Sequence, residues 1–489
     1  SIVSAKLYPA CITLIFAATT SGFLANFFCK NFSVCNIGRS KNMFALGVVY
    51  WMFNRPMEQT EKFLEKKFAK KPEVVASNIK VMHAGYNFAD TIEALSSSYT
   101  VLSANLKSGT YRNVMGNQAI AWGFLAAAER SNKELFLGSY PITPASDILH
   151  ELAKHKNLGV KTFQAEDEIA GICSAIGASF TGSLAITTTS GPGLALKSEG
   201  LGLAIMAELP LVVVNVQRGG PSTGLPTKTE QSDLMQALYG RNGESPSVVL
   251  ASSTPGNCFD WAYMASKITL EHNTPVVLLS DGYLGNGAEP WKIKSTMDMP
   301  EINPSIAVEG EEYQPYARDK KTLARKIALP GTKGLEHRLG GLEKEDITGN
   351  VSYDPENHEK MVGIRAEKIN RIAGIIPNQE IFGKKEGDLL VVGWGGTHGS
   401  LYSGVDNLQK TGKKIALCQF NYINPLPKNT AEIFSKYKKI VVCELNSGQF
   451  ANYLRMNFQG TIFHQYNKIQ GFPFTTSELE SHFKTLLSK

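Results

Sequence analysis

The sequence predicts an α/β protein in which helices cover both faces of parallel sheets. Short apolar runs of strand length alternate with helical stretches from Val114 onward, a pattern typical of buried parallel strands. The alternation stops near Pro290 and resumes after Glu386, which predicts two α/β domains of unequal size. The length of 489 residues also exceeds what a single core normally supports.

Composition and charge exclude several classes of protein. The 50 basic and 44 acidic side chains leave a net charge of only +6, too little to favour binding of nucleic acid. The seven cysteines form no C-x-x-C pair, and none lies at zinc-ligand spacing from a histidine. We therefore expect no metal site and no iron–sulfur cluster on this chain, and a reducing, cytoplasmic compartment.

An uncharged stretch of 22 residues, Leu7–Phe28, lies near the N-terminus. Its length would allow a membrane span, and Lys6 in front of it would allow a signal peptide. Pro9 and Gly22 weaken the interpretation as a membrane span. We favour a buried strand–helix segment of a domain cut at its front, because the chain starts with Ser1 rather than Met, and we expect no membrane association.

Three helices are predicted next. Residues 41–53 are apolar nearly all round, which indicates a buried helix that ends before Pro56. Residues 57–68 are amphipathic and charged, as in a surface helix, and residues 72–90 form the third helix. A small polar link near Lys107 then marks a domain boundary.

The strands of the two α/β domains are predicted at the apolar runs. In the first domain these runs cover residues 134–140, 183–189, 209–217, 247–253 and 275–281. In the second domain they cover residues 388–396, 413–421 and 438–446. Cys418 and Cys443 lie within the last two runs and are expected to be buried core thiols. Residues 290–378 are rich in charge, Pro and Gly, and we interpret them as a long surface connection.

Ligands of open parallel sheets bind at the carboxyl ends of the strands. The segment "YPITPASD" (140–147) occupies one such end. Thr143 is expected to cap a helix there, with Pro144 as its first residue and Asp147 in its first turn. The amides of such a helix start would suit a carboxylate, although a capped helix with no ligand is the alternative.

The segment "TSGPGLALKS" (189–198) follows a second strand and approaches the phosphate-binding pattern G-x-x-x-x-G-K-[ST]. Leu196 stands where the second glycine should be, and its side chain would intrude on a phosphate. We expect Leu196 to face the core of a helix that starts near Gly193, and Lys197 to be solvated. Gly191 and Gly193 leave little side-chain bulk, so that a flat ligand could approach the backbone closely.

Two further segments carry charge at strand ends. Arg218 begins the glycine-rich segment 218–233, and its guanidinium group could bind a carboxylate through two parallel hydrogen bonds. A solvated surface arginine is the alternative. Glu166, Asp167 and Glu168 open an apolar helix, where acidic side chains favour the helix dipole. One of these carboxylates could also face a cofactor and exchange a proton with a heterocycle.

Together these segments resemble the pyrimidine-binding domain of thiamine diphosphate enzymes. In that domain a glutamate opens a helix and a "TSGPG" loop follows about 23 residues later, as Thr189 follows Glu166 here. With "YPITPASD" and "QRGGPSTGLPTKTEQSDL" added, the chain resembles the α subunit of 2-oxoacid:ferredoxin oxidoreductases, most closely the 2-oxoglutarate type. The likeness runs from about Asn42 to the C-terminus. Residues 40–105 resemble the end of a γ domain that some members fuse in front of α, and the first 40 residues do not match it, so we expect a truncated γ domain.

The resemblance implies a division of the α/β chain into four parts. These are a partial γ-like domain (1–106), a pyrimidine-binding domain (107–300), a connecting segment (301–378) and a domain like the C-terminal domain of transketolase (379–489). It implies that Glu166 is the catalytic glutamate that hydrogen-bonds N1′ of the aminopyrimidine. It also implies that Thr143 and Arg218 bind the substrate carboxylate, and that Ser190, Gly191 and Pro192 contact the cofactor.

The same resemblance implies partners. The cofactor's diphosphate is held in the family by Mg²⁺ through a GDG motif, for which "SDGYLGNG" (280–287) is the only near candidate, without the asparagine that should follow. A β subunit would therefore supply the Mg²⁺ site and the 4Fe–4S cluster, ferredoxin would accept the electrons and CoA the acyl group. The chain alone should be inactive. His398 is expected to be a turn residue, with a catalytic base as the alternative.

Two other functions stay open at this point. The motifs do not separate 2-oxoglutarate from pyruvate or a branched-chain 2-oxoacid as the substrate. A nucleotide-binding regulatory protein built on "GPGLALKS" (191–198) is the alternative from another class.

Overall fold

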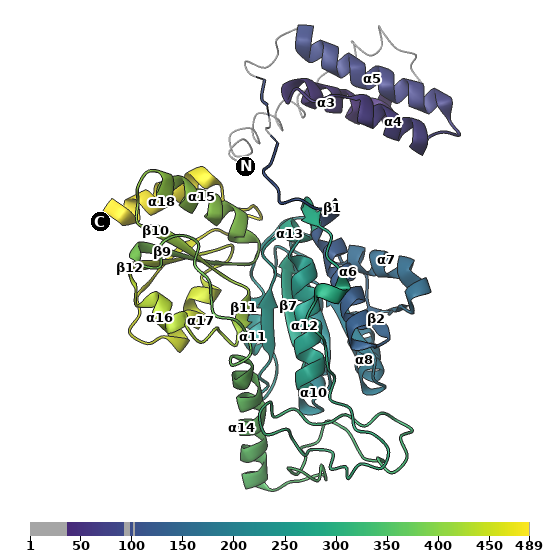
Figure 1. Cartoon of the computed structure of the whole chain (residues 1–489), viewed down its shortest axis with the longest axis vertical. Coiled ribbons are helices and arrows are strands. Elements are labelled where there is room, and N and C mark those ends of the chain that lie inside the picture. The colour runs from purple at the N-terminus through teal and green to yellow at the C-terminus, as the bar shows by residue number, and fades with distance from the viewer. Residues whose placement is uncertain (1–36, 92–97, 101–102, 489) are drawn as a thin grey trace. The chain divides into compact units, whose positions relative to one another are not determined.

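The computed structural model describes residues 37–91, 98–100 and 103–488. The chain divides into two compact units, Ser1–Ser108 and Gly109–Lys489, and each is described by itself (Figure 1). The uncharged stretch Leu7–Phe28, with its three interpretations, lies outside the described residues. Within the described ranges, no helix combines the length and the apolar character that crossing a membrane requires.

The three predicted helices are confirmed in the first unit as α3 (Ile37–Met52), α4 (Glu58–Lys67) and α5 (Pro72–Thr91). Two glycines let α3 and α5 approach closely. A Cβ atom at Gly47 would lie 1.9 Å from the carbonyl oxygen of Met82, and one at Gly85 would lie 2.0 Å from that of Phe44. Over residues 41–52, Phe44 and Met52 are buried and most other side chains are partly buried, so the helix is less completely buried than predicted.

The larger sheet of the second unit has seven strands in the order β11-β6-β7-β5-β4-β2-β3. The strands are β2 (Leu135–Ser139), β3 (Lys161–Gln164), β4 (Leu184–Thr189), β5 (Val212–Gln217), β6 (Val248–Ala251), β7 (Val276–Asp281) and β11 (Tyr422–Asn424). All neighbours are parallel except β11 and β6. The five predicted runs are confirmed as strands. The edge strand β3 escapes prediction because it is short and largely exposed.

Helices cover both faces of this sheet (Figure 1). One face packs against α6 (Gly116–Ser131), α7 (Ser146–Leu152) and α12 (Cys258–His272). The other packs against α8 (Glu168–Phe180), α9 (Gly191–Leu196), α10 (Ser198–Met206) and α11 (Leu234–Tyr239). Within β5, Val212 and Val214 face the first core while Val213 faces the second. Burial of both faces explains why the strands read as continuous apolar runs.

Shorter elements connect the larger ones. They are η1 (Ala153–Leu158), α13 (Gly282–Asn286), η2 (Thr296–Asp298), and an antiparallel pair made of β1 (Tyr111–Met115) and β8 (Ala288–Lys292). The segment that follows η2 is irregular up to Asp354, as expected for a connection. It then forms an 18-residue helix, α14 (Pro355–Ile372), that the sequence prediction lacks. The signal was present, because Asp354 caps the helix by accepting from Asn357 N at 2.7 Å and Pro355 occupies its first position.

A buried ion cluster joins this connection to the first sheet. Arg318 donates to Glu208 Oε1 at 2.6 Å, and Lys368 on α14 donates to Glu208 Oε2. Glu208 and Lys368 are each only 1–2 % exposed. Although burial raises the pKa of Glu208, the charges of Lys368 and Arg318 lower it below its usual value. The charged carboxylate of Glu208 therefore holds the segment around Arg318 and the helix α14 against the first sheet.

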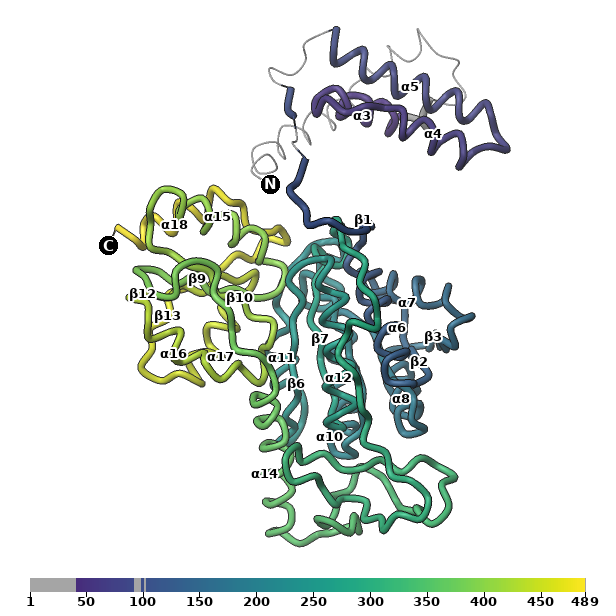
Figure 2. Tube along the Cα trace, viewed as in Figure 1, coloured from purple at the N-terminus to yellow at the C-terminus, as the bar shows by residue number. Residues whose placement is uncertain are grey.

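The smaller sheet has the parallel order β10-β9-β12-β13. Its strands are β9 (Gly387–Trp394), β10 (Ile415–Phe420), β12 (Tyr437–Glu444) and β13 (Phe463–Asn467), with η3 (Gly395–Thr397), α15 (His398–Lys410), α16 (Thr430–Phe434), α17 (Gln449–Asn457) and α18 (Thr476–Ser488) around them. Cys418 and Cys443 are fully buried, as predicted. Figure 2 shows how the trace passes from the irregular segment through α14 into this domain.

Candidate functional site

The strand order of the larger sheet reverses between β2 and β4, because the connections that leave β2 and β3 run to opposite sides of β2. Strand β3 lies on one side of β2, and β4 lies on the other. Such a switch point opens a crevice at the carboxyl ends of the two strands. Ser139, the last residue of β2, donates from Oγ to the carbonyl oxygen of Thr188 at 2.8 Å. The "YPITPASD" and "TSGPG" segments leave the sheet directly beyond this contact.

The glycines of the "TSGPG" loop are required by close neighbours. A Cβ atom at Gly191 would lie 2.7 Å from Oδ1 of Asp233. One at Gly193 would lie 2.1 Å from Oγ1 of Thr189 and 2.7 Å from Cγ of Glu168. Ser190 is buried, and its hydroxyl has no hydrogen-bond partner among the described residues. The loop therefore presents backbone and an unsatisfied hydroxyl group rather than side-chain bulk.

The three acids before α8 occupy different places. Glu166 is exposed, and the structure gives its carboxylate no contact with the loop. Asp167 caps α8 by accepting from Ala170 N at 2.7 Å, which confirms it as a helix-start charge. Glu168 is only 7 % exposed, and its side chain packs against Gly193. Glu168 also lies in the first turn of α8, as expected for a helix-start charge. The catalytic assignment to Glu166 stays a prediction.

Arg218 and Thr143 are brought together, but through the backbone. Arg218 Nη1 donates to the carbonyl oxygen of Thr143 at 2.6 Å, while the Thr143 side chain is exposed. Arg218 is 7 % exposed, and its Nε has no partner among the described residues. The arginine is therefore neither free nor solvated, and part of its guanidinium group remains available to a ligand.

The predicted helix cap at Thr143 is wrong. The helix α7 begins at Ser146, and its N-cap is Ala145, without a side-chain hydrogen bond. The carbonyl groups of Thr143 and Pro144 accept from Arg218 and from Asn117 Nδ2 (2.8 Å) instead of pointing along a helix. Asp147 does lie in the first turn, as expected.

Sequence reasoning missed a buried polar pair that lies next to the "TSGPG" loop. Asn215, on β5, donates from Nδ2 to Asp233 Oδ2 at 2.9 Å. Burial raises the pKa of Asp233 from 3.8 to about 6, against the hydrogen bond from Asn215, and the charge of Glu230 raises it further. Asp233 is the last residue of the glycine-rich segment 218–233. This segment follows a strand end where a ligand was expected, and that position could have indicated Asp233 as a site residue.

The predictions for the two residues after the glycines are both wrong. Leu196 is 52 % exposed, whereas Lys197 is fully buried. The reason is that α9 ends at Leu196 and α10 begins at Ser198, so Lys197 stands at a break between helices and turns inward. Lys197 Nζ donates to the backbone carbonyl of Glu168 at 2.8 Å. An ammonium group held in this way is not placed to bind the phosphates of a nucleotide.

Asp281 does not behave as a metal ligand. Its carboxylate accepts from Thr229 Oγ1 (3.0 Å), from the amides of Tyr283 and Leu284, and from Gly396 N (3.1 Å). Burial raises its pKa. The side chain therefore caps α13 and ties the larger sheet to the turn before α15. In the part of the chain that the structure describes, no group of three His, Cys, Asp or Glu side chains is arranged to hold a metal.

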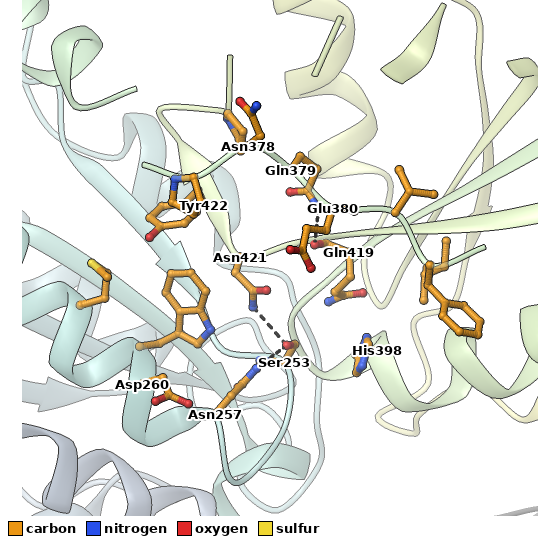
Figure 3. A pocket seen from close by; sticks show the side chains of 17 residues that line it. Ser253, Asn257, Asp260, Asn378, Gln379, Glu380, His398, Gln419, Asn421 and Tyr422 are labelled. Atoms are coloured by element: carbon orange, nitrogen blue, oxygen red, sulfur yellow. Dashed lines mark hydrogen bonds between the residues drawn. The ribbon is translucent and has the colours of Figure 1, made fainter. Parts of the chain in front are cut away.

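A cavity of about 680 Å³ lies between the larger sheet and the C-terminal domain (Figure 3). Figure 3 shows His398 and Gln419 on one side of it and Asn257, Asn421 and Asp260 on the other. No lysine or arginine lines this cavity, so it offers no cation to a carboxylate or phosphate. His398 is the first residue of α15 rather than a turn residue, and burial lowers its pKa.

Several large apolar side chains in the segments around these strands are exposed. They are Tyr140 (38 %), Phe163 (47 %), Ile169 (49 %), Leu196 (52 %), Leu225 (50 %) and Tyr283 (53 %).

The comparisons with known proteins agree with this geometry. Residues 129–353 match the family model described as pyruvate flavodoxin/ferredoxin oxidoreductase, thiamine diphosphate-binding, and residues 26–88 match the model pyruvate ferredoxin/flavodoxin oxidoreductase. The chain is 49 % identical to the 2-oxoglutarate oxidoreductase subunit KorA of Mycobacterium tuberculosis over 92 % of this chain and 69 % of that protein. It is 33 % identical to the 2-oxoglutarate synthase subunit KorA of Methanocaldococcus jannaschii over 69 % of this chain and 88 % of that protein.

A solved structure is also similar. It is the 2-oxoglutarate:ferredoxin oxidoreductase from Magnetococcus marinus with 2-oxoglutarate, coenzyme A and succinyl-CoA bound. The TM-score is 0.84 at 33 % identity, and the match covers 92 % of this chain and 78 % of that one.

Proposed function

Because the chain belongs to the 2-oxoacid:ferredoxin oxidoreductase family, we propose that it is the α subunit of a 2-oxoglutarate:ferredoxin oxidoreductase. The reaction joins 2-oxoglutarate and CoA to give succinyl-CoA and CO₂, and the two electrons released pass singly to ferredoxin. The observation that carries the proposal is the meeting, at one switch point, of the glycine loop, the acidic start of α8 and the guanidinium group of Arg218.

The residues at the crevice fit the aminopyrimidine half of thiamine diphosphate. Gly191 and Gly193 carry no side chain, so the loop offers backbone against which a planar ring could lie. The space that their Cβ atoms would take is filled by Asp233, Thr189 and Glu168 of this chain. The unsatisfied hydroxyl group of Ser190 is a polar partner for a heterocycle. When bound, the cofactor supplies the electron sink for decarboxylation of a 2-oxoacid.

The side chains of this chain would position and exchange protons. We propose that Glu166, which precedes the "TSGPG" loop by the spacing found in the family, exchanges the proton with the ring. Its side chain is exposed in this chain, where the cofactor and a partner subunit can reach it. Arg218 would bind a carboxylate of the 2-oxoacid through its donors that Thr143 does not use. Ser190, Gly191 and Pro192 would line the cofactor.

As an α subunit, the chain works with a partner subunit and with ferredoxin. We propose further that the partner supplies the Mg²⁺ site for the diphosphate and a 4Fe–4S cluster. The hydrogen bonds that Asp281 accepts from Thr229, Tyr283 and Gly396 support this division, because they already occupy its carboxylate.

We retain the four-part division of the chain as a proposal, with 1–106 as a γ-like domain, 107–300 as the pyrimidine-binding domain, 301–378 as the connection and 379–489 as the transketolase-like domain. The match of residues 26–88 to the second family model supports the first of these. The smaller parallel sheet formed by β9, β10, β12 and β13 supports the last.

The test is to express the chain together with its partner subunit and to measure reduction of a viologen dye that depends on CoA and a 2-oxoacid. We expect activity with 2-oxoglutarate, and a lower kcat/KM with pyruvate and branched-chain 2-oxoacids. A preference for either of those would revise the substrate. Binding of ATP by the isolated chain, with no 2-oxoacid-dependent activity in the complex, would support the regulatory alternative instead.

A further inference from the structure

The glycine-rich segment 218–233 folds back on itself directly after Arg218. Strand β5 ends one residue earlier, so Arg218 is the first residue beyond the sheet. The amide of Gly219 donates to the carbonyl oxygen of Lys228 at 2.9 Å, and the residues between these two form an exposed loop. Arg218 is therefore held on one side by β5 and on the other by the returning half of the segment, residues 228–233.

The returning half is fixed in turn by the C-terminal domain, through Gln231. This residue is completely buried, and each of its hydrogen-bonding groups has a partner in that domain. Its amide donates to the carbonyl oxygen of Leu445 at 3.1 Å, and its carbonyl oxygen accepts from Asn446 Nδ2 at 2.8 Å. Its side-chain Nε2 donates to the carbonyl oxygen of Trp394 at 2.7 Å, and its Oε1 accepts from the amide of Leu445 at 3.0 Å. The partners lie at the carboxyl ends of β9 and β12.

Contacts on either side of Gln231 add to this attachment. Gln449, the first residue of α17, donates from Nε2 to the carbonyl oxygen of Ser232 at 2.7 Å. The ammonium group of Lys228 lies over the ring of Phe472, 4.2 Å from its centroid. The C-terminal domain therefore contacts both ends of the returning half, and Lys228 passes the constraint on to the residue that follows Arg218.

A purely structural role is the alternative, because a buried amide with all its hydrogen bonds made also stabilises a domain interface. The composition of the segment favours a role in the site. Gly219, Gly220 and Gly224 leave the backbone after Arg218 with many accessible conformations, so its attachments must select one. Arg218 spends one nitrogen on the carbonyl oxygen of Thr143. The direction of its remaining donors therefore depends on the backbone that the returning half holds in place.

We propose that Gln231 is a positioning residue through which the C-terminal domain fixes the segment 218–233, and so holds the guanidinium group of Arg218 where the carboxylate of the 2-oxoacid binds. This inference rests on the proposed function, in which Arg218 binds that carboxylate. It gives the C-terminal domain a part in substrate binding, and it assigns Gln231 no contact with substrate or cofactor.

The first test measures steady-state kinetics in the complex with the partner subunit. Gln231→Met removes both side-chain hydrogen bonds at similar size, and Gln231→Asn keeps a shorter amide. The matched control is Gln409→Met, because Gln409 Nε2 also donates to a backbone carbonyl of the C-terminal domain, that of Ile415 at 2.8 Å. We expect Gln231→Met to raise the KM for 2-oxoglutarate by about 3- to 10-fold while kcat changes less than about 3-fold, the pattern of weakened substrate binding. Gln231→Asn should lie between Gln231→Met and the wild type, and Gln409→Met should keep the wild-type KM.

The second test asks whether Gln231 acts through Arg218. In a chain that already carries Arg218→Ala, adding Gln231→Met should raise the KM no further, because the group that Gln231 positions is gone. If the two effects on the KM multiply instead, Gln231 acts elsewhere and the proposal is wrong. This double-mutant comparison separates positioning from general stability, which a lost interface contact would lower in either background.

A second variant keeps the inference testable if Gln231→Met does not assemble with the partner. Gln449→Met removes the hydrogen bond to Ser232 and the one that Gln449 Oε1 accepts from the amide of Met235 at 3.0 Å, and it leaves Gln231 in place. We expect a smaller rise in the KM, again absent when Arg218→Ala is present. A wild-type KM in this variant would then overturn the proposal.

The outcomes separate this inference from the function on which it rests. An active wild-type complex in which Arg218→Ala raises the KM but Gln231→Met does not would overturn the role of Gln231 alone. An active complex in which Arg218→Ala leaves the KM unchanged would overturn the role of Arg218 and this inference with it. A wild-type complex without any 2-oxoacid-dependent activity would overturn the proposed function itself.

Discussion

The guanidinium group of Arg218 donates a hydrogen bond from Nη1 to the backbone carbonyl of Thr143 over 2.6 Å. This contact joins the segment after β5 to the segment after β2, on opposite sides of β4 in the sheet. One nitrogen of the side chain is thereby committed to the fold, and the remaining donors lie at the end of the crevice. The arginine is fixed before a ligand arrives, which reduces the entropy lost on binding.

Replacement of Arg218 should weaken binding of the 2-oxoacid. Arg218→Ala removes charged hydrogen bonds worth about 1.5–3 kcal/mol, so we expect the KM for 2-oxoglutarate to rise by roughly 10- to 100-fold. Arg218→Lys should be intermediate, because an ammonium group lacks the planar fork. Steady-state kinetics of the complex measure both, with the exposed Arg338→Ala as the control. An unchanged KM in Arg218→Ala would contradict the assignment.

Glu166 and Glu168 form a matched pair for testing the proton-exchanging carboxylate. Glu166→Gln should lower kcat by about 10²- to 10⁴-fold, the range for loss of a general acid–base group. Glu168→Gln should retain more activity, because Glu168 lies in the first turn of α8 as a helix-start charge. Viologen reduction by the two complexes gives the comparison, and circular dichroism checks that each is folded. The opposite result would move the proton-exchanging role from Glu166 to Glu168.

Asp233 should make the stability of the chain depend on pH. Its pKa is raised from 3.8 to about 6 in the folded state, so the folded chain binds more protons between these values. Stability should therefore fall as the pH rises from about 4 to 6, by up to about 2–3 kcal/mol. Asp233→Asn should remove this dependence and be more stable than the wild type at pH 8 but not at pH 4. Urea unfolding at several pH values tests this, with the exposed Asp298→Asn for comparison.

The buried cluster around Glu208 should be sensitive to the loss of one charge. Glu208→Gln leaves the ammonium group of Lys368 and the guanidinium group of Arg318 buried without a counter-charge. Breaking a buried pair in this way costs about 3–5 kcal/mol. We expect a lower urea midpoint for Glu208→Gln, and almost no change for the exposed Glu312→Gln. Equal midpoints would show that water or rearrangement satisfies the two cations.

The fold was predictable where one physical cause decides the pattern. Strands such as Val212–Gln217 are buried on both faces, so their sequence is apolar throughout and stands out. The edge strand Lys161–Gln164 is largely exposed and carries no such signal. The helix Pro355–Ile372 buries cationic side chains such as Lys368. A search for apolar residues at helical spacing therefore misses part of its buried face.

The site was predictable to the level of the segment rather than the residue. Glycine spacing and strand ends indicated the "TSGPG" loop and Arg218, because both follow from backbone geometry. Among the three acids before α8, the sequence does not fix where the helix begins; in the structure Asp167 is the N-cap and Glu168 is the first helical residue. The inward turn of Lys197 depends on a break between α9 and α10, which tertiary packing imposes on a sequence with strong helical tendency.

Strand β11 gives the chain an order of assembly. Tyr422 pairs with Leu250, and Asn424 donates from Nδ2 to the carbonyl oxygen of Ser247 at 2.7 Å. The edge strand next to β6 is therefore synthesised long after β6 itself. During synthesis β6 emerges with open amides and carbonyls, and an open edge is a template for pairing with other chains. A nascent chain should therefore need a chaperone until β11 has left the ribosome, and a stop codon before Tyr422 should yield aggregates rather than a shorter enzyme.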